Sequence, residues 1–183
     1  MISIPAGPDE ITSQWLRTVL GSVDVGLDCE AKSCSVERIG QGIGFICRIY
    51  RVTLTYGHSS TDVPQSVVVK LNSDDPQFDR YWAQPGRSAY EKEARFYREI
   101  AATADLRTPC YYYDATDWDA RRSVLVMEDL SWTRAGNQVD GYSADDAIVA
   151  ARDWARFNAG FWNNDRLRSI GDLPGFTSGI ESL

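Results

Sequence analysis

The sequence predicts an α+β fold, in which a five-stranded, mainly antiparallel sheet packs against one helix and is flanked by an N-terminal and a C-terminal helix. Five short segments are rich in β-branched and aromatic residues, which favours strands. Three longer segments repeat their apolar residues with the period of a helix. Most links between the expected strands are short, and short links favour antiparallel pairing because parallel strands need long crossover connections.

The first half of the chain predicts one helix and three strands. The helix is expected over residues 8–21, because apolar residues recur there at helical spacing. Two strands follow, at 35–40 and 45–56, on either side of a glycine-rich turn. The apolar residues of the second strand do not alternate strictly, so we expect a β-bulge within it. A third strand, rich in β-branched residues, is expected at 65–72.

The second half predicts a helix at 88–104 and then strands at 110–116 and 123–128. A connector leads to the last helix, which we expect to begin after Ser143 and to run to about Trp162. A serine hydroxyl is a typical N-cap acceptor, and two aspartates follow in the first turn, where the helix dipole favours negative charge.

Composition excludes several classes of function. The chain has 183 residues and a formal net charge of −7, with 19 basic and 26 acidic side chains. Nucleic acid and anionic membranes both need a basic surface, so neither partner is expected. No apolar run approaches the roughly 20 residues of a membrane span, and the N-terminus lacks a secretory pattern. The four cysteines form no C-x-x-C pair, so we expect reduced thiols in a cytoplasmic protein and no zinc site.

The first candidate site is the turn Gly40-Gln41-Gly42-Ile43-Gly44. Alternate glycines leave backbone amides able to face an anion, and the alternative interpretation is a flexible hairpin. The turn is not a Walker A motif, because no Gly-Lys-Ser/Thr follows it. It is not a dinucleotide fingerprint either, because a strand follows rather than a helix.

Lys70 and Glu93 are candidates for a charged pair. Lys70 lies in a β-branched strand, where a lysine is seldom buried unless it is paired, although it can also reach water from the strand end. On the expected helix Glu93 lies in the middle of the apolar face, where an unpaired carboxylate is costly. Lys70 is the best cationic partner, and the alternative is that Glu93 reaches the edge of the face or pairs with Arg51. The apolar residues within about 60° of Glu93 are Ala89, Tyr90, Phe96, Tyr97, Ile100 and Ala104.

The last candidate is the segment Met127-Glu128-Asp129-Leu130, where an apolar strand runs into two acids. On its own it is equally a strand exit with Asp129 capping the next turn. The four features in order form a more specific series: a glycine-rich hairpin, a strand lysine, a glutamate on a buried helix face, and an apolar strand that ends in Met-Glu-Asp-Leu.

This series resembles the N-terminal lobe of the protein-kinase-like fold. More narrowly, it resembles the aminoglycoside and choline phosphotransferase group, nearest its ecdysteroid-kinase-like branch. Glu93-Ala94-Arg95-Phe96-Tyr97 is similar to the helix of that group, and Thr108-Pro109 before a strand matches as well. Glu128-Asp129-Leu130 is similar to the hinge between the lobes, and 154–162 to the first helix of the C-terminal lobe, except that Asn158 stands where the family usually has His.

The resemblance covers residues 11–162 and divides the chain into an N-lobe with its N-terminal helix at 1–128 and a hinge with the truncated start of a C-lobe at 129–183. It implies that the glycine-rich turn covers the phosphates of ATP, that the lysine contacts the α- and β-phosphates, and that the glutamate holds the lysine. The backbone after the last strand would bind adenine, and a hydroxyl of a small molecule would accept the phosphoryl group. The expected nucleotide-binding residues are Gly40, Gly42, Gly44, Lys70, Glu93, Met127, Glu128 and Leu130.

The family's catalytic loop is missing from the sequence. That loop reads His-Gly-Asp, with an Asn five residues after the Asp and a metal-binding Asp later, and no such pattern follows Trp162. The nearest fragment, Ile170-Gly171-Asp172, lacks the His and has Thr177 in place of the Asn. We therefore expect no catalytic or metal-binding residue here, Mg²⁺ only with a complete C-lobe, and no kinase activity by this chain alone.

The last helix has a wide apolar face that, in a complete kinase, would pack on the rest of the C-lobe. We expect it to lack a partner within the chain and to form a homodimer, since large exposed apolar patches tend to find another surface. An alternative function is therefore a non-catalytic dimerising or scaffold module that keeps the fold. A third reading, a small β-rich protein unrelated to kinases, predicts that Lys70 and Glu93 do not meet. The apolar residues of the face are Ala147, Ile148, Ala151, Trp154, Ala155, Phe161 and Trp162.

Overall fold

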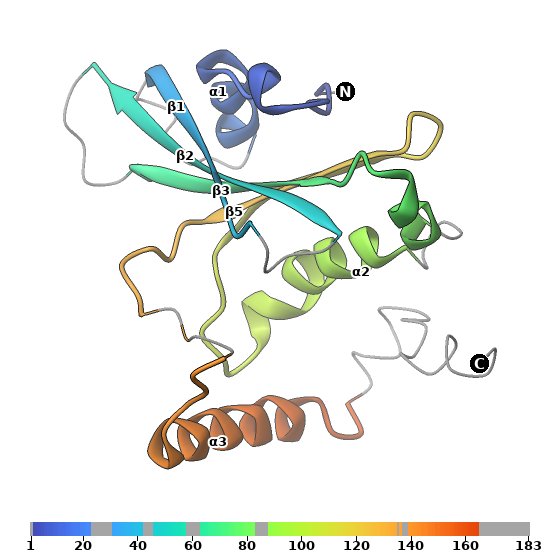
Figure 1. Ribbon diagram of the computed structural model, residues 1–183. Coiled ribbons are helices and arrows are strands. Elements are labelled where there is room, and N and C mark those ends of the chain that lie inside the picture. The colour runs from blue at the N-terminus through green and yellow to red at the C-terminus, as the bar shows by residue number, and fades with distance from the viewer. Residues whose placement is uncertain are drawn as a thin grey trace. The chain divides into compact units, whose positions relative to one another are not determined.

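The computed structural model describes residues 2–22, 31–41, 46–57, 63–82, 88–134, 136 and 139–164. The chain divides into two units (Figure 1). The first unit comprises Met1–Ala94 and Pro109–Asp129 and contains the sheet. The second unit comprises Arg95–Thr108 and Leu130–Leu183 and contains the last helix.

The first unit is built on a five-stranded sheet in the order β1-β2-β3-β5-β4, and every neighbouring pair is antiparallel. The predicted α+β class with a five-stranded antiparallel sheet is confirmed. The hairpin of the last two strands folds back so that its second strand pairs with β3. The strands are β1 (Ala31–Ile39), β2 (Cys47–Tyr56), β3 (Ser66–Asn72), β4 (Tyr111–Asp117) and β5 (Arg122–Glu128).

The N-terminal segment covers one face of the sheet. The single helix expected at 8–21 is divided into a short 3₁₀ helix, Pro8–Glu10, and α1 (Ser13–Gly21). The break follows from Thr12, which has an extended backbone and whose hydroxyl accepts a hydrogen bond from the Trp15 amide, so that it caps a new helix. The core between α1 and the sheet contains Trp15, Leu16, Val19, Leu20, Tyr50, Val52, Leu54, Val67, Val69, Leu71, Val124 and Val126, among others.

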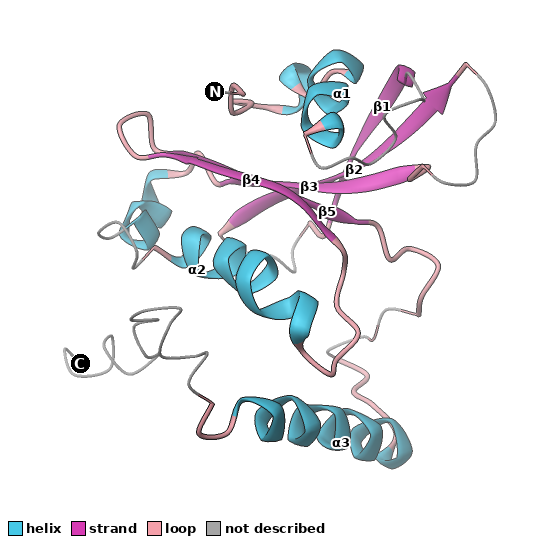
Figure 2. Ribbon diagram, turned by 180° about the vertical axis from the view of Figure 1, so that it is seen from behind, coloured by secondary structure: helices cyan, strands magenta, loops and turns pink. Residues whose placement is uncertain are grey.

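The opposite face of the sheet carries α2 (Ala89–Arg95), as Figures 1 and 2 show from two sides. The helical segment expected at 88–104 is helical but not regular. After α2 it continues as a π-turn, Phe96–Ile100, and a 3₁₀ turn, Ala101–Thr103. A π-turn shifts the helical phase, so only residues up to Arg95 keep the angular positions that a regular helix predicts.

The expected bulge within the second strand is wrong. The pairing of β2 with β3 is continuous from Cys47 to Thr53, and the irregularity in the β1–β2 pair falls between Ala31 and Ser33 on β1. The apolar pattern of β2 is irregular for another reason. Ile49 pairs with Lys70 and shares its face, whereas Val52 belongs to the core on the α1 side. Both faces of the sheet are covered, so apolar residues occur on both.

The second unit contains α3 (Ala144–Phe161). The predicted N-cap is confirmed, because the Ser143 hydroxyl accepts a hydrogen bond from the Asp146 amide at 3.1 Å. Phe157 of α3 packs against Phe96 with ring centroids 6.2 Å apart. In the part of the chain that the structure describes, no helix has the length and apolar character needed to cross a membrane.

Candidate functional site

The face of the sheet that carries α2 also carries Lys70. Antiparallel neighbours in register share a face, and Lys70 lies between Ile49 on β2 and Leu125 on β5. The next row on the same face contains Arg51, Val68 and Met127. The lysine therefore stands within a largely apolar surface that spans three strands.

Lys70 forms an ion pair with Glu93 of α2, as the sequence predicts. The side chains are 18% and 32% exposed, so the pair is partly desolvated while both ends remain accessible. Arg51, the alternative partner for Glu93, pairs with Asp129 at 2.9 Å. Lys70 and Glu93 therefore meet, contrary to what the third reading predicts.

A small cavity adjoins this pair, with a volume of about 10 Å³, which is room for about one water molecule. Its lining includes Lys70, Glu93, Tyr90 and Cys47. Burial raises the pKa of the Cys47 thiol to about 11, with a smaller lowering from Lys70 and a smaller rise from Glu93. The thiol is therefore protonated and uncharged at neutral pH, and it lines the cavity beside the ion pair.

Of the glycine-rich turn, the structure describes Gly40 and Gln41, and description of the chain resumes at Ile46. Gly40 follows β1 and has a φ of +66°, a conformation that residues other than glycine rarely adopt. Gly42 and Gly44 lie outside the described residues. Just before β2, the Ile46 carbonyl accepts hydrogen bonds from the Ser73 amide and from the Tyr90 hydroxyl, both at 3.0 Å. The base of the turn is therefore anchored both to the sheet and to α2.

Tyr90 is a residue whose role the sequence analysis missed. Its ring packs against Trp82 at a centroid distance of 4.9 Å, and burial raises the pKa of its hydroxyl to about 12. The hydroxyl is thus a donor over the whole physiological range. Periodicity placed Tyr90 on the apolar face of its helix, but no local pattern names a carbonyl 44 residues away as its acceptor.

Three residues at and after the end of β5 were expected to contact adenine: Met127, Glu128 and Leu130. Met127 is buried. The Glu128 amide donates to the Cys110 carbonyl at 2.9 Å, and the Glu128 carboxylate accepts from the Cys110 amide at 2.9 Å. Leu130 belongs to the second unit, where its carbonyl accepts hydrogen bonds from the amide and the hydroxyl of Thr133.

Asp129 has a larger role than the cap that the sequence allowed. Its side chain is only 3% exposed, and one carboxylate oxygen accepts from Arg51 Nε at 2.9 Å and from Ser66 Oγ at 2.7 Å. The acid therefore reaches from the end of β5 to β3 and β2. The only signal in the sequence is an acid after an apolar strand, which does not identify partners 63 and 78 residues away.

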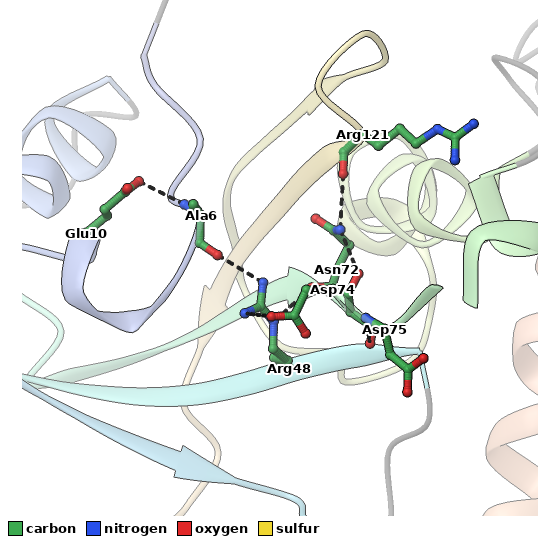
Figure 3. A network of polar contacts seen from close by, with 8 residues as sticks. Ala6, Glu10, Arg48, Asn72, Asp74, Asp75 and Arg121 are labelled. Carbon is green, nitrogen blue, oxygen red and sulfur yellow. Dashed lines mark hydrogen bonds and ion pairs between the residues drawn. The ribbon is translucent and has the colours of Figure 1, made fainter. Parts of the chain in front are cut away.

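A separate polar network lies at the other end of β3 (Figure 3). Arg48 donates to the carbonyls of Asn72 and Ala6, both at 3.0 Å, and pairs with Asp74 at 2.9 Å. The Asn72 side chain donates to the Arg121 carbonyl and accepts from the Ser123 amide. These bonds fasten the N-terminal segment and the β4–β5 turn to the sheet, which is a structural role.

Across the described residues, no group of three or more His, Cys, Asp and Glu side chains could hold a metal ion. Comparison of the chain with protein-family models, with curated proteins and with solved structures finds no match.

Proposed function

We propose that the sheet unit is the ATP-binding lobe of a small-molecule phosphotransferase, which transfers a phosphoryl group from ATP to a hydroxyl of its substrate. The observation that carries the proposal is the ion pair between Lys70 and Glu93, on the face of the sheet that also carries Met127 near the end of β5. The order of these parts along the chain is the one that the kinase-like resemblance implies.

Lys70 has the chemistry of a phosphate contact. An ammonium group has three donors, so a lysine bound to one carboxylate can still donate to an anion. Glu93 holds the ammonium against β3 and limits its rotamers, which lowers the entropic cost of binding a phosphate there. The base of the adjoining turn is anchored by Ser73 and Tyr90 and does not depend on ligand for its position.

The neighbouring surface suits a purine. Ile39, Ile49 and Val68 are half-buried on the face that carries Lys70, and Met127 is buried beside them. A flat aromatic base gains free energy by covering such aliphatic side chains. The backbone that follows Met127 would supply the polar contacts that distinguish the base.

The residues of this chain would bind and orient ATP, but the resemblance assigns the activation of the acceptor hydroxyl to a His-Gly-Asp segment. The sequence contains no His-Gly-Asp segment. Phosphoryl transfer would therefore need a positioned general base and a metal site supplied from outside these residues. The acceptor would be a hydroxyl group of a small molecule.

Titration calorimetry with Mg²⁺·ATP tests the proposal. We expect binding that Lys70→Ala weakens by at least about ten-fold, the size of one charge-assisted contact. Lys92→Ala is the matched control, because Lys92 lies on α2 next to Glu93 but is not in the ion pair. No binding of ATP by the wild-type chain, or equal losses in the two variants, would contradict the proposal.

A second candidate function is a non-catalytic dimerising or scaffold module. The observation that favours it is the exposure of large apolar side chains on α3, where Trp154 is 62% and Ile148 is 50% exposed. Trp162, just after the helix, is 84% exposed. This function predicts self-association without nucleotide binding, so the same calorimetry separates the two candidates.

A further inference from the structure

The end of β5 is fastened by a side chain at the point where its backbone pairing stops. The register of β3 with β5 runs from Leu71–Val124 to Val67–Glu128, and the next opposed pair would be Ser66 with Asp129. There the link is the hydrogen bond from Ser66 Oγ to the Asp129 carboxylate, at 2.7 Å. The side chain thus continues the attachment of β5 to β3 by one more residue.

The Asp129 carboxylate also makes contact with β2, the strand beyond β3. Arg51 Nε of β2 donates to it at 2.9 Å, and the Arg51 guanidinium also lies 3.8 Å from Glu37 of β1. One buried acid therefore connects the end of β5 to β3 and β2, and indirectly to β1. A carboxylate that is 3% exposed needs such partners, since an unpaired buried charge is very costly.

We infer that Asp129 is a positioning residue for the base of the bound nucleotide, an inference that rests on the proposed function. The carboxylate ties the backbone from Glu128 to Asp129 to β3 and β2, next to the apolar side chains of Val68 and Met127. That backbone is where polar contacts to a purine would come from. The phosphate contact at Lys70 lies two residues along β3 from Val68 and belongs to a different pair of side chains.

The inference separates binding of the base from binding of the phosphates. Asp129→Ala removes the hydrogen bonds from Ser66 and Arg51 that hold the end of β5, but leaves the ion pair of Lys70 and Glu93 intact. We expect the affinity for Mg²⁺·ATP to fall about ten-fold and the affinity for inorganic tripolyphosphate to change less than about two-fold. A residue that only stabilises the fold would weaken both ligands equally, so the ratio of the two affinities is the decisive readout.

Asp74→Ala is the matched control. Asp74 also pairs with an arginine of β2 at 2.9 Å, but near the other end of β3 and with a side chain that is 75% exposed. This variant is expected to keep both affinities. If Asp129→Ala does not fold, Ser66→Ala is the milder test, because it removes only the hydrogen bond between Ser66 and Asp129. We expect it to lower the affinity for Mg²⁺·ATP about three-fold and to leave the affinity for tripolyphosphate unchanged. Ser66→Thr retains the hydroxyl and is expected to restore the wild-type ratio.

The calorimetric outcomes are distinguishable. ATP binding that depends on Lys70, together with an unchanged ratio in the Asp129 and Ser66 variants, overturns the positioning role and leaves the proposed function standing. A wild-type chain that binds neither ATP nor tripolyphosphate overturns both. Binding of ATP without any binding of tripolyphosphate also counts against both, because the lysine would then not be a phosphate contact.

Discussion

The hydroxyl of Tyr90 on α2 donates a hydrogen bond to the carbonyl of Ile46 at 3.0 Å, and so joins the helix that carries Glu93 to the base of the glycine-rich turn. Tyr90→Phe removes only this donor and keeps the ring against Trp82. The Ile46 carbonyl retains the Ser73 amide, so we expect a loss of about 1 kcal/mol in the free energy of unfolding, measured by urea denaturation.

The control for Tyr90→Phe is Tyr142→Phe, since Tyr142 is 65% exposed. A change within about 0.5 kcal/mol is expected there. Equal effects in the two variants would show that the buried hydroxyl does not hold the turn.

The ion pair of Lys70 and Glu93 should give a measurable coupling free energy between the two side chains. We expect Lys70→Met and Glu93→Gln each to destabilise the chain, because each leaves a partly buried charge without its partner. The double variant should lose less than the sum, with a coupling of about 1 kcal/mol in a double-mutant cycle of unfolding free energies. Additive losses would mean that the contact contributes nothing to stability.

The thiols should differ in reactivity. Burial raises the pKa of Cys47 to about 11 from its ordinary 9.0, so at pH 8 the reactive thiolate is scarcer than in an unfolded chain. Cys110 is exposed. At pH 8, pulsed alkylation followed by peptide mass spectrometry should label Cys110 in the native protein and Cys47 only after unfolding. Labelling of native Cys47 should rise as the pH approaches 11. Rapid labelling of native Cys47 at pH 8 would contradict this burial.

Residues 1–183 should not transfer phosphate. With Mg²⁺ and γ-labelled ATP, and with hydroxyl-bearing small molecules as acceptors, we expect no labelled product above the level of the Lys70→Ala variant. The reason is the missing His-Gly-Asp segment and its metal-binding partners. Labelled product that disappears in Lys70→Ala would overturn this prediction.

Self-association should depend on α3. Trp154 and Trp162 are exposed, and burying aromatic side chains is the usual driving force of such contacts. We expect a dimer in multi-angle light scattering and dissociation on replacing both with serine. Trp132→Ser is the control, since Trp132 is 71% exposed but precedes α3. A monomer at every concentration tested would contradict the prediction.

Much of the fold was predictable because its signals are local. β-branched runs located the strands to within a few residues, and the Ser143 cap marked the start of α3. The break at Thr12 and the π-turn at Phe96–Ile100 were not predictable from apolar spacing, because capping competes with helix continuation and a π-turn leaves the apolar pattern similar. The irregular pattern of β2 was misread as a bulge because the sequence does not reveal how many faces of a sheet are covered.

The contacts of the candidate site were likewise predictable only in part. Glu93 was expected to need a cation because helix geometry places it among apolar neighbours, and the pair with Lys70 is present. The same argument left Arg51 open as its partner, and the structure pairs Arg51 with Asp129 instead.

The sequence by itself determined the order of the five strands and the three main helical segments, the cap of α3, and the need of a glutamate on an apolar helix face for a positive partner. Only the tertiary structure decided which partner that is, that Tyr90 holds the base of the glycine-rich turn, and that Asp129 fastens the end of β5 to Ser66 and Arg51. The physical reason is range. Propensity, capping and periodicity act over a few residues, whereas these contacts join residues from 23 to 78 positions apart and exist only once strand register brings them together.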